Sequence, residues 1–288
     1  MNQLLKLDHP FIPEWGMAEK VELKIMSYNI WNYNEPWVER RKLIVDTILE
    51  ADPDIVGLQE IRDDRKYNPV GHDQARQIAE RTGFDYQYQP AMVYSRKPRS
   101  VEGLCIMSRH PIESTSYIEL TKEPDDKKDY HQRIVLNGTV SSPMGSMEFF
   151  VTHFSLSQEM RVSNAVELLQ FVNTFNSHLP KFIVGDFNCT PDDLPIKVLT
   201  GIDRVDDQEV VGNLVDVWDE TPPGHRKPAT RRVHTHDKRR IDFIFMIPSP
   251  WAEASVKEFN VLKKENDEGI PASDHAALIS TIQISSAG

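Results

Sequence analysis

Cysteine is scarce in this sequence, whose 288 residues include only Cys105 and Cys189. Without a CxxC pair, the sequence gives no sign of a disulfide framework or of a cysteine-rich zinc site. Both cysteines fall in stretches that resemble strands or motifs. We therefore expect two reduced, buried thiols and, from them, a reducing, cytoplasmic location.

Long hydrophobic runs are also missing. No apolar stretch approaches the roughly 20 residues that a membrane-spanning helix needs. The first 20 residues, MNQLLKLDHPFIPEWGMAEK, lack the basic start and apolar core of a signal peptide. We expect neither a membrane span nor a secretory leader.

Positive charge is in the minority, because 44 acidic residues outnumber 33 lysines and arginines and give a net charge of −11. This balance argues against a general duplex-coating protein, which would be basic. Two basic stretches stand out, SRKPR at 95–99 and HRKPATRRVHTHDKRR at 225–240. Either one alone is typical of a solvated loop.

The signatures of several enzyme classes are absent, among them GxSxG, the P-loop, the glycine-rich dinucleotide turn and HExxH. Repeats, low-complexity tracts and Gly/Ser linkers are absent too. We expect a single domain over residues 21–288, preceded by an N-terminal extension over residues 1–20.

Strand-like runs dominate what is present. They lie at 21–31, 54–61, 86–94, 103–108, 133–140, 147–154, 181–187, 241–247, 255–262 and 277–284. Helical periodicity covers 37–51, 72–83 and 157–179, and Thr190 or Asp192 is expected to cap a further short helix. The pattern favours an α/β fold with two packed sheets and helices outside. We prefer SPMGS at 142–146 to Asn137-Gly138 as the hairpin turn.

Polar side chains collect where these apolar strands meet loops. Any one of them is an ordinary cap or turn former, but six such junctions point to a rigid catalytic edge. The residues are Asn29, Glu60, His153, Asp186 with Asn188, Asp242, and Asp274 with His275.

These junctions carry a family resemblance. SYNIW, DIVGLQE, EGLCIMSRH, FFVTHFS, VGDFNCTP, RRIDFIF and SDHAAL occur in this order. Together they resemble the endonuclease/exonuclease/phosphatase (DNase I-like) superfamily over about residues 21–284. The resemblance implies a four-layer α/β sandwich of two packed mixed β-sheets flanked by helices. It also implies metal-dependent cleavage of a phosphoester by in-line attack of water.

The resemblance also implies a metal site of hard oxygen ligands, which suits Mg²⁺, with Mn²⁺ as a substitute. Glu60 is the first expected ligand. Asn29 would help to hold the site and its neighbouring carboxylate, and Asp274 would bind a second or alternative metal.

Catalytic roles follow from the same resemblance. Asp186 would position or deprotonate the water, and Asn188 would donate a hydrogen bond to the phosphate. Asp242 would pair with His275, and the choice of base between Asp186 and His275 stays open. His153 would stabilise the phosphorane or protonate the leaving oxygen.

Three further expectations concern the surroundings of the site. Glu102 would be the partner of His153, and Arg133 is either a phosphate contact or a surface strand charge. Trp31, Tyr33 and Trp37 are candidates to stack on a base or ring, although core packing is the default for Trp37. If the family fold holds, both basic stretches would flank the catalytic edge.

The substrate is expected to be a phosphodiester, with nucleic acid favoured. Abasic endonucleases have a tyrosine where this chain has His153, and inositol 5-phosphatases have a WCDR-like stretch where it reads KRRIDFIF. A lipid or inositol-phosphate phosphoesterase is the alternative enzyme. An inactive binding protein of the same fold is the alternative from another class.

Overall fold

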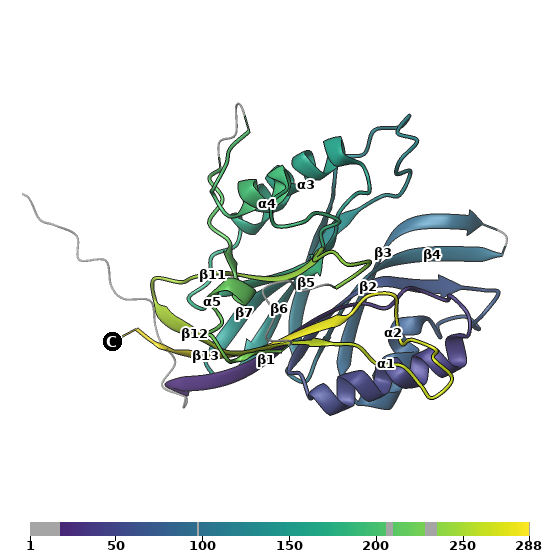
Figure 1. The fold of residues 1–288 in the computed structure, drawn as a ribbon, viewed down its shortest axis with the longest axis horizontal. Coiled ribbons are helices and arrows are strands. Elements are labelled where there is room, and N and C mark those ends of the chain that lie inside the picture. Colours follow the sequence, from purple (N-terminus) through teal and green to yellow (C-terminus); the bar gives the residue numbers. More distant parts are fainter. Residues whose placement is uncertain (1–17, 97, 206–209, 228–234, 288) are drawn as a thin grey trace, which may run out of the picture.

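Two mixed β-sheets pack face to face in the computed structural model, and helices cover their outer faces (Figure 1). The structure describes residues 18–96, 98–205, 210–227 and 235–287. In the described part of the chain, no helix is long and apolar enough to span a membrane.

The first sheet contains seven strands. They are β1 (Lys20–Asn29), β2 (Ile55–Asp64), β3 (Asp85–Arg96), β4 (Arg99–Ser108), β10 (Arg226–Lys227), β12 (Ala252–Leu262) and β13 (Ala277–Ser286). Their spatial order is β10-β12-β13-β1-β2-β4-β3. β1 pairs parallel with β2 and antiparallel with β13, which makes the sheet mixed.

The second sheet contains six strands. They are β5 (Ile112–Glu119), β6 (Ile134–Ser142), β7 (Gly145–His153), β8 (Lys181–Asp186), β9 (Val215–Asp216) and β11 (Asp242–Ile247). Their spatial order is β5-β6-β7-β8-β11-β9, with β7 and β8 parallel and β8 and β11 antiparallel.

Three apolar cores separate four layers. One core lies between the sheets, where strand residues such as Ile25, Val151 and Val184 are fully buried. Gly57 of β2 marks a close approach between the sheets, because a Cβ there would lie 2.3 Å from Val184 Cγ2. The other cores lie between each sheet and its helices. This arrangement confirms the α/β sandwich that the sequence predicts.

The helices form the two outer layers. α1 (Trp37–Ala51) and α2 (Gln74–Thr82) cover the first sheet; α3 (Gln158–Val172) and α4 (Leu194–Leu199) cover the second, at the bottom and top of Figure 1. A single-turn helix, α5 (Val217–Glu220), follows β9.

Several element predictions need correction. β5, β9 and β10 were not predicted: β5 is an exposed edge strand with little apolar alternation, and the others are two residues long. The 157–179 helix ends at Val172, because Asn173 and Thr174 turn their side chains back onto the carbonyls of Leu169 and Phe171.

The expected cap of α4 is also wrong. Its N-cap is Asp193, whose carboxylate accepts hydrogen bonds from the backbone N and hydroxyl of Thr190. Two smaller predictions are confirmed. The β6–β7 hairpin turns at 142–146, and Cys105 and Cys189 are free and buried.

Candidate active site

Three neighbouring strands of the second sheet place polar residues in one row. His153 ends β7 and pairs in register with Asp186, which ends β8. Asp242 begins β11 and is the antiparallel partner of the same Asp186. Because residues opposite each other on adjacent strands share a face, the three side chains point together at the edge of the sheet. His153 Nε2 lies 3.5 Å from Asp186 Oδ2.

A bulge in the first sheet aims Glu60 into the same region. The sequence places Glu60 at the end of its strand, but β2 continues to Asp64, and this expectation is wrong. The β2–β4 register shifts between Leu58 and Ile61, and Glu60 has a φ of 59°. Bulges of this kind redirect a side chain without ending the strand.

Asn29 connects the two sheets. Its Nδ2 donates to Glu60 Oε1 at 3.0 Å and to Asp186 Oδ2 at 3.2 Å, while its Oδ1 accepts from the Trp31 backbone N. Asn32 Nδ2 donates to the second Glu60 oxygen at 2.8 Å. Two amides therefore fix Glu60, and Asn29 bonds to both carboxylates; its predicted part in a metal site stays a prediction.

Arg40 of α1 stabilises the loop that contains Trp31 and Asn32. This fully buried guanidinium donates to the carbonyls of Ile30, Trp31, Asn32 and Asn34, and across to Ala272 next to the Asp274–His275 segment. Arg40 thus joins two loops of the site. Within an amphipathic helix, nothing in the sequence distinguishes Arg40 from its neighbours.

His275 and Asp242 form the predicted pair. His275 Nδ1 lies 2.9 and 3.1 Å from the two Asp242 carboxylate oxygens, and its Nε2 lies 3.6 Å from Asp186 Oδ2. Burial disfavours the imidazolium, but the Asp242 carboxylate outweighs it and raises the pKa of His275 to about 10.

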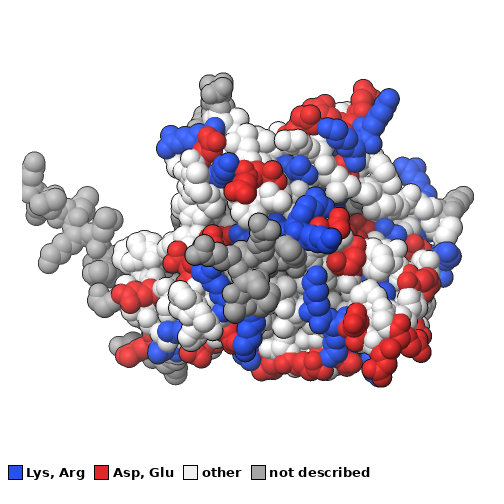
Figure 2. Space-filling view, in the orientation of Figure 1, with Lys and Arg blue, Asp and Glu red and all other residues white. Residues whose placement is uncertain are grey.

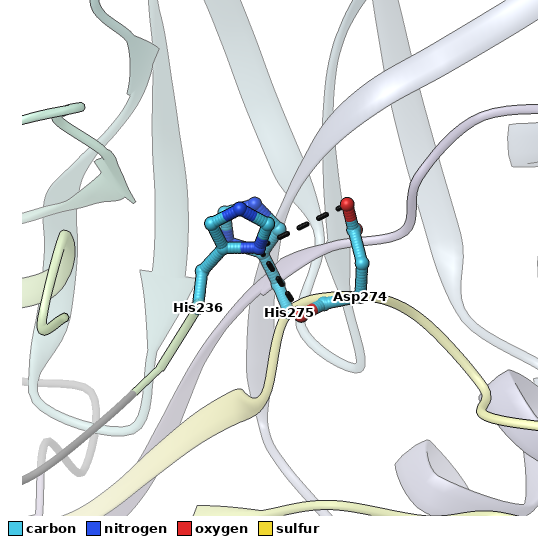
Figure 3. A group of neighbouring side chains, drawn as sticks. All are labelled: His236, Asp274 and His275. Atoms are coloured by element: carbon cyan, nitrogen blue, oxygen red, sulfur yellow. Dashed lines mark hydrogen bonds and ion pairs between the residues drawn. The ribbon is translucent and has the colours of Figure 1, made fainter. Parts of the chain in front are cut away.

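His236 packs against this pair. Its ring stacks on His275 with 4.3 Å between centroids, and its Nδ1 lies 3.2 Å from the Asp274 carbonyl O and 3.8 Å from Asp274 Oδ2 (Figure 3). The sequence placed His236 only within a basic run, so its position beside His275 was missed.

Asp186 is a buried carboxylate in the middle of the row. Burial, followed by the nearby charge of Asp242, raises the pKa of Asp186 to about 7. Its Oδ1 accepts from the Asn188 backbone N at 2.9 Å, and Asn188 Nδ2 donates to Phe154 O at 3.0 Å. Burial lowers the pKa of His153 well below its usual value, which favours the neutral imidazole.

Glu102 of β4 has partners other than the one expected. It accepts from Arg62 Nε and Nη2 at 3.1 and 2.6 Å and from the Tyr94 hydroxyl at 3.2 Å. Among the hydrogen bonds of the described residues, none joins Glu102 to His153, although both line the cleft, and the predicted partnership stays a prediction. Arg62 also lies over the Tyr94 ring, 4.3 Å from its centroid.

Arg133 is not a surface charge, because it is only 7% exposed. Its Nε donates to Asp129 Oδ2 at 3.0 Å, and the same oxygen accepts from Ser155 Oγ and from the Leu156 backbone N. His131 Nδ1 lies 3.1 Å from Asp129 Oδ1. Burial raises the pKa of Asp129, but the hydrogen bond with His131 and the charge of Arg133 outweigh it and lower it well below its usual value.

A single cleft of about 320 Å³ joins these groups. Its described lining comprises Trp31, Asn32, Asn34, Glu60, Tyr94, Glu102, His131, Arg133, His153, Leu156, Asp186, Asn188, His236, Arg239, Ile241, Asp274 and His275. Residues from nearly every part of the chain thus meet at one edge of the two sheets. Asp242 and Asn29 lie behind this lining, in contact with His275 and Glu60.

Comparison with known proteins agrees with this geometry. The sequence profile of the Endonuclease/Exonuclease/phosphatase family matches residues 26–275. The chain belongs to this family. Membership of this family supports hydrolysis of a phosphoester as the activity. A search of curated proteins finds no match.

Several solved structures of the family share the fold. A family protein from Bacteroides thetaiotaomicron has a TM-score of 0.68 at 19% identity, covering 92% of this chain and 99% of its own. A mannosyl-6-phosphatase from the same organism gives 0.66 at 20% identity, with 90% and 99% covered. The human Nocturnin catalytic domain gives 0.67 at 19% identity, with 92% and 97% covered.

The family site contains groups that could hold a metal. Two sets of ligand atoms lie within 4.8 Å of one another among the described residues: Asp186, Asp242 and His275, and His236, Asp274 and His275. Glu60 belongs to neither set. It shares the cleft, however, and its charge contributes to the raised pKa of Asp274, after burial.

The expectations for ring stacking are only partly met. Trp37 is buried and donates its indole N–H to Gln77, and Tyr33 is buried between the rings of Trp37 and Tyr67. Both belong to the core, which leaves Trp31 as the member of the predicted trio that lines the cleft.

The basic stretches contribute less than expected. From 225–240, His236 and Arg239 line the cleft, Arg240 pairs with Asp216 at 2.6 Å, and 228–234 lie outside the described residues. The stretch 95–99 lies at the β3–β4 turn, where Lys97 is not described. The described cleft lining from this hairpin is Tyr94 and Glu102, without Arg96 or Arg99.

Proposed function

We propose that the protein is a Mg²⁺-dependent phosphodiesterase that hydrolyses nucleic acid by in-line attack of water on phosphorus. The observation that supports this most is the convergence of Glu60, Asp186, His275 and His153 on one cleft from both sheets. A protein that only bound its ligand would have no need of this complete set. We infer also that residues 21–288 act as one domain.

Each residue of the cleft has a separate role in the proposed reaction. Asp186, with its pKa near neutrality, accepts the proton of the attacking water or orients that water. His275, held cationic by Asp242, binds a non-bridging phosphate oxygen. Asn188 has a second amide hydrogen beyond the one given to Phe154 O, and it donates this to the phosphate.

His153 and Arg133 complete the set on the leaving-group side. His153 is neutral and therefore accepts a hydrogen bond or passes on a proton rather than adding charge. Arg133 supplies the permanent positive charge near it, since Asp129 fixes its Nε and the guanidinium lines the cleft. Glu102 acts through Arg62 and Tyr94 to shape this side.

The donor set fits a hard divalent cation. Glu60 and Asp274 line the same cleft and supply carboxylate oxygens. Mg²⁺ bound there would neutralise the phosphate and the developing charge, with Mn²⁺ as a substitute. Asn29 and Asn32 keep Glu60 in place for this role.

The test is a substrate panel measured with Mg²⁺ and with EDTA. It contains single- and double-stranded DNA, RNA, sphingomyelin, inositol phosphates, bis-p-nitrophenyl phosphate and, because of the similar phosphatase structure, mannose 6-phosphate. We expect cleavage of nucleic acid that EDTA abolishes. Asp186→Asn should keep the fold and lower kcat by about 100- to 10,000-fold, the range for a general base.

The outcomes separate the candidates. Activity confined to a lipid, inositol phosphate or sugar phosphate would replace the nucleic acid assignment with the alternative substrate class. Cleavage that is equally fast in EDTA would refute the metal role. Absence of turnover on every substrate, with ligand binding retained, would favour an inactive binding protein.

A further inference from the structure

A row of aromatic rings leads from the cleft to the surface. Tyr94 and His131 both line the cleft, and their ring centroids are 5.2 Å apart. Tyr130 continues the row, edge-on to His131 at 4.4 Å, and is 65% exposed. The catalytic roles above do not use Tyr130 or His131.

The inner part of this row is rigid. The Tyr94 hydroxyl lies 3.2 Å from His131 Nε2, and His131 Nδ1 lies 3.1 Å from Asp129 Oδ1. Both nitrogens of His131 are thereby fixed, so its ring cannot turn away. The Tyr130 ring packs edge-on against this fixed ring, and most of the Tyr130 surface is exposed to solvent. A large exposed aromatic supported in this way is preorganised for contact with a ligand.

Two cations lie near Tyr130. Arg133, three residues further along the chain, lines the cleft, and Lys122 Nζ lies 3.4 Å from the Tyr130 carbonyl. Sites for single-stranded nucleic acid combine stacked rings with cations that follow the phosphates. A lipid tail would instead need a continuous apolar surface, whereas the neighbouring 121–128 stretch is rich in charged, exposed residues.

We propose that Tyr130, held in place by His131, forms a stacking shelf for a nucleobase of the substrate, beside His153 on the leaving-group side. This rests on the proposed function, since it requires a nucleic acid substrate. The shelf binds a base by its π-face, so it favours single strands and is tolerant of sequence.

The experiment compares a single-stranded oligonucleotide with its counterpart built of abasic tetrahydrofuran residues. For the wild type, we expect KM to be about tenfold lower on the base-bearing strand, within the range for one stacked base. Tyr130→Ala should remove this preference by raising KM on the base-bearing strand alone, with kcat little changed. Tyr130→Trp should retain it, because the ring is restored.

Tyr117→Ala is the matched control, because Tyr117 is an exposed tyrosine of the edge strand β5 that does not line the cleft. A second readout uses Asp186→Asn with 2-aminopurine in the strand, whose fluorescence should fall on binding and recover when Tyr130→Ala is added. Equal KM on both strands for the wild type, or an unchanged preference in Tyr130→Ala, overturns the shelf while the nuclease assignment stands. No cleavage of either strand, with activity on another substrate class, overturns both.

Discussion

At the scale of single residues, the electrostatics of the site depend on which buried charges have a partner of opposite charge. His275 lies between three carboxylates, and only Asp242 touches it at hydrogen-bond distance. Asp216 offers a contrast in the same sheet. It is buried like Asp242, but its partner is Arg240 at 2.6 Å. The His275–Asp242 pair can therefore lose its charge as the pH rises through about 10, whereas the arginine of the Asp216–Arg240 pair stays charged.

This contrast predicts how stability depends on pH. The pKa of His275 is about 10 in the folded state, above its ordinary value of 6.5, so its ion pair stabilises the fold fully below pH 6.5. That contribution is lost as the pH rises through 10. Asp242→Asn should therefore destabilise the protein by roughly 2 kcal/mol at pH 6 and by much less at pH 10. Urea unfolding in EDTA measures this.

Asp216→Asn is the control for that series. Arg240 keeps its charge throughout the range, so the cost of Asp216→Asn should not change between pH 6 and pH 10. A cost of Asp242→Asn that is equally independent of pH would show that His275 is neutral in the fold.

The sequence revealed residues whose position had a local signature. Asn29, His153, Asp186 and Asp242 lie at strand ends that apolar runs make visible, and the structure brings them together. Arg40, Arg62, Tyr94, Asp129 and His131 had no such signature. Each is an ordinary polar residue in a helix, strand or loop, and only the tertiary contacts, which sequence spacing does not encode, give it a role.

At the scale of elements, the core strands were predictable and the exposed ones were not. β8 and β11 consist of fully buried apolar runs, which the sequence shows directly. β5 lies at a sheet edge with mostly exposed residues, and nothing in its composition requires a strand. The bulge at Glu60 was equally hidden, because its cause is the pairing of β2 with β4 rather than the sequence of β2 alone.

Gly185 controls how closely β8 approaches β7 just before Asp186. Its φ is 159°, and a Cβ there would lie 2.2 Å from the Thr152 carbonyl O of β7. Gly185→Ala should therefore separate the two strands, destabilise the protein by about 2 kcal/mol and displace Asp186 from His153. We expect kcat to fall by more than the loss of folded protein alone would cause. Kinetics measure kcat, and urea unfolding measures the free energy of unfolding.

Gly269→Ala separates the effect of the contact between strands from the effect of the positive φ. Gly269 also has a positive φ, 76°, but a Cβ there would meet no atom within 4 Å. Its substitution should cost about 1 kcal/mol through the backbone alone and leave kcat unchanged. Equal effects of the two substitutions would show that the contact between β7 and β8 does not matter.

At the scale of the whole molecule, the proposed function requires an acidic protein to admit a polyanion. Acidic side chains gather along the bottom and lower right of the molecule, over α1 and α2, while Lys and Arg lie near the centre and also along the upper edges (Figure 2). Among the described residues that line the cleft, the permanent cations are Arg133 and Arg239. The chain as a whole has a net charge of −11, which opposes extended contact with nucleic acid.

This distribution predicts a weak dependence of binding on salt. Each phosphate neutralised on a single strand contributes about −0.7 to the slope of log K against log salt, so Arg133, Arg239 and the cationic His275 together give about −2.1. Anisotropy of a labelled single strand with Asp186→Asn, at constant Mg²⁺ and increasing KCl, measures the slope. Arg239→Gln should reduce it by about 0.7, and Arg99→Gln, outside the cleft lining, should leave it unchanged. A slope beyond about −4 would require six or more phosphate contacts, and the acidic surface would then not limit the interface as we infer.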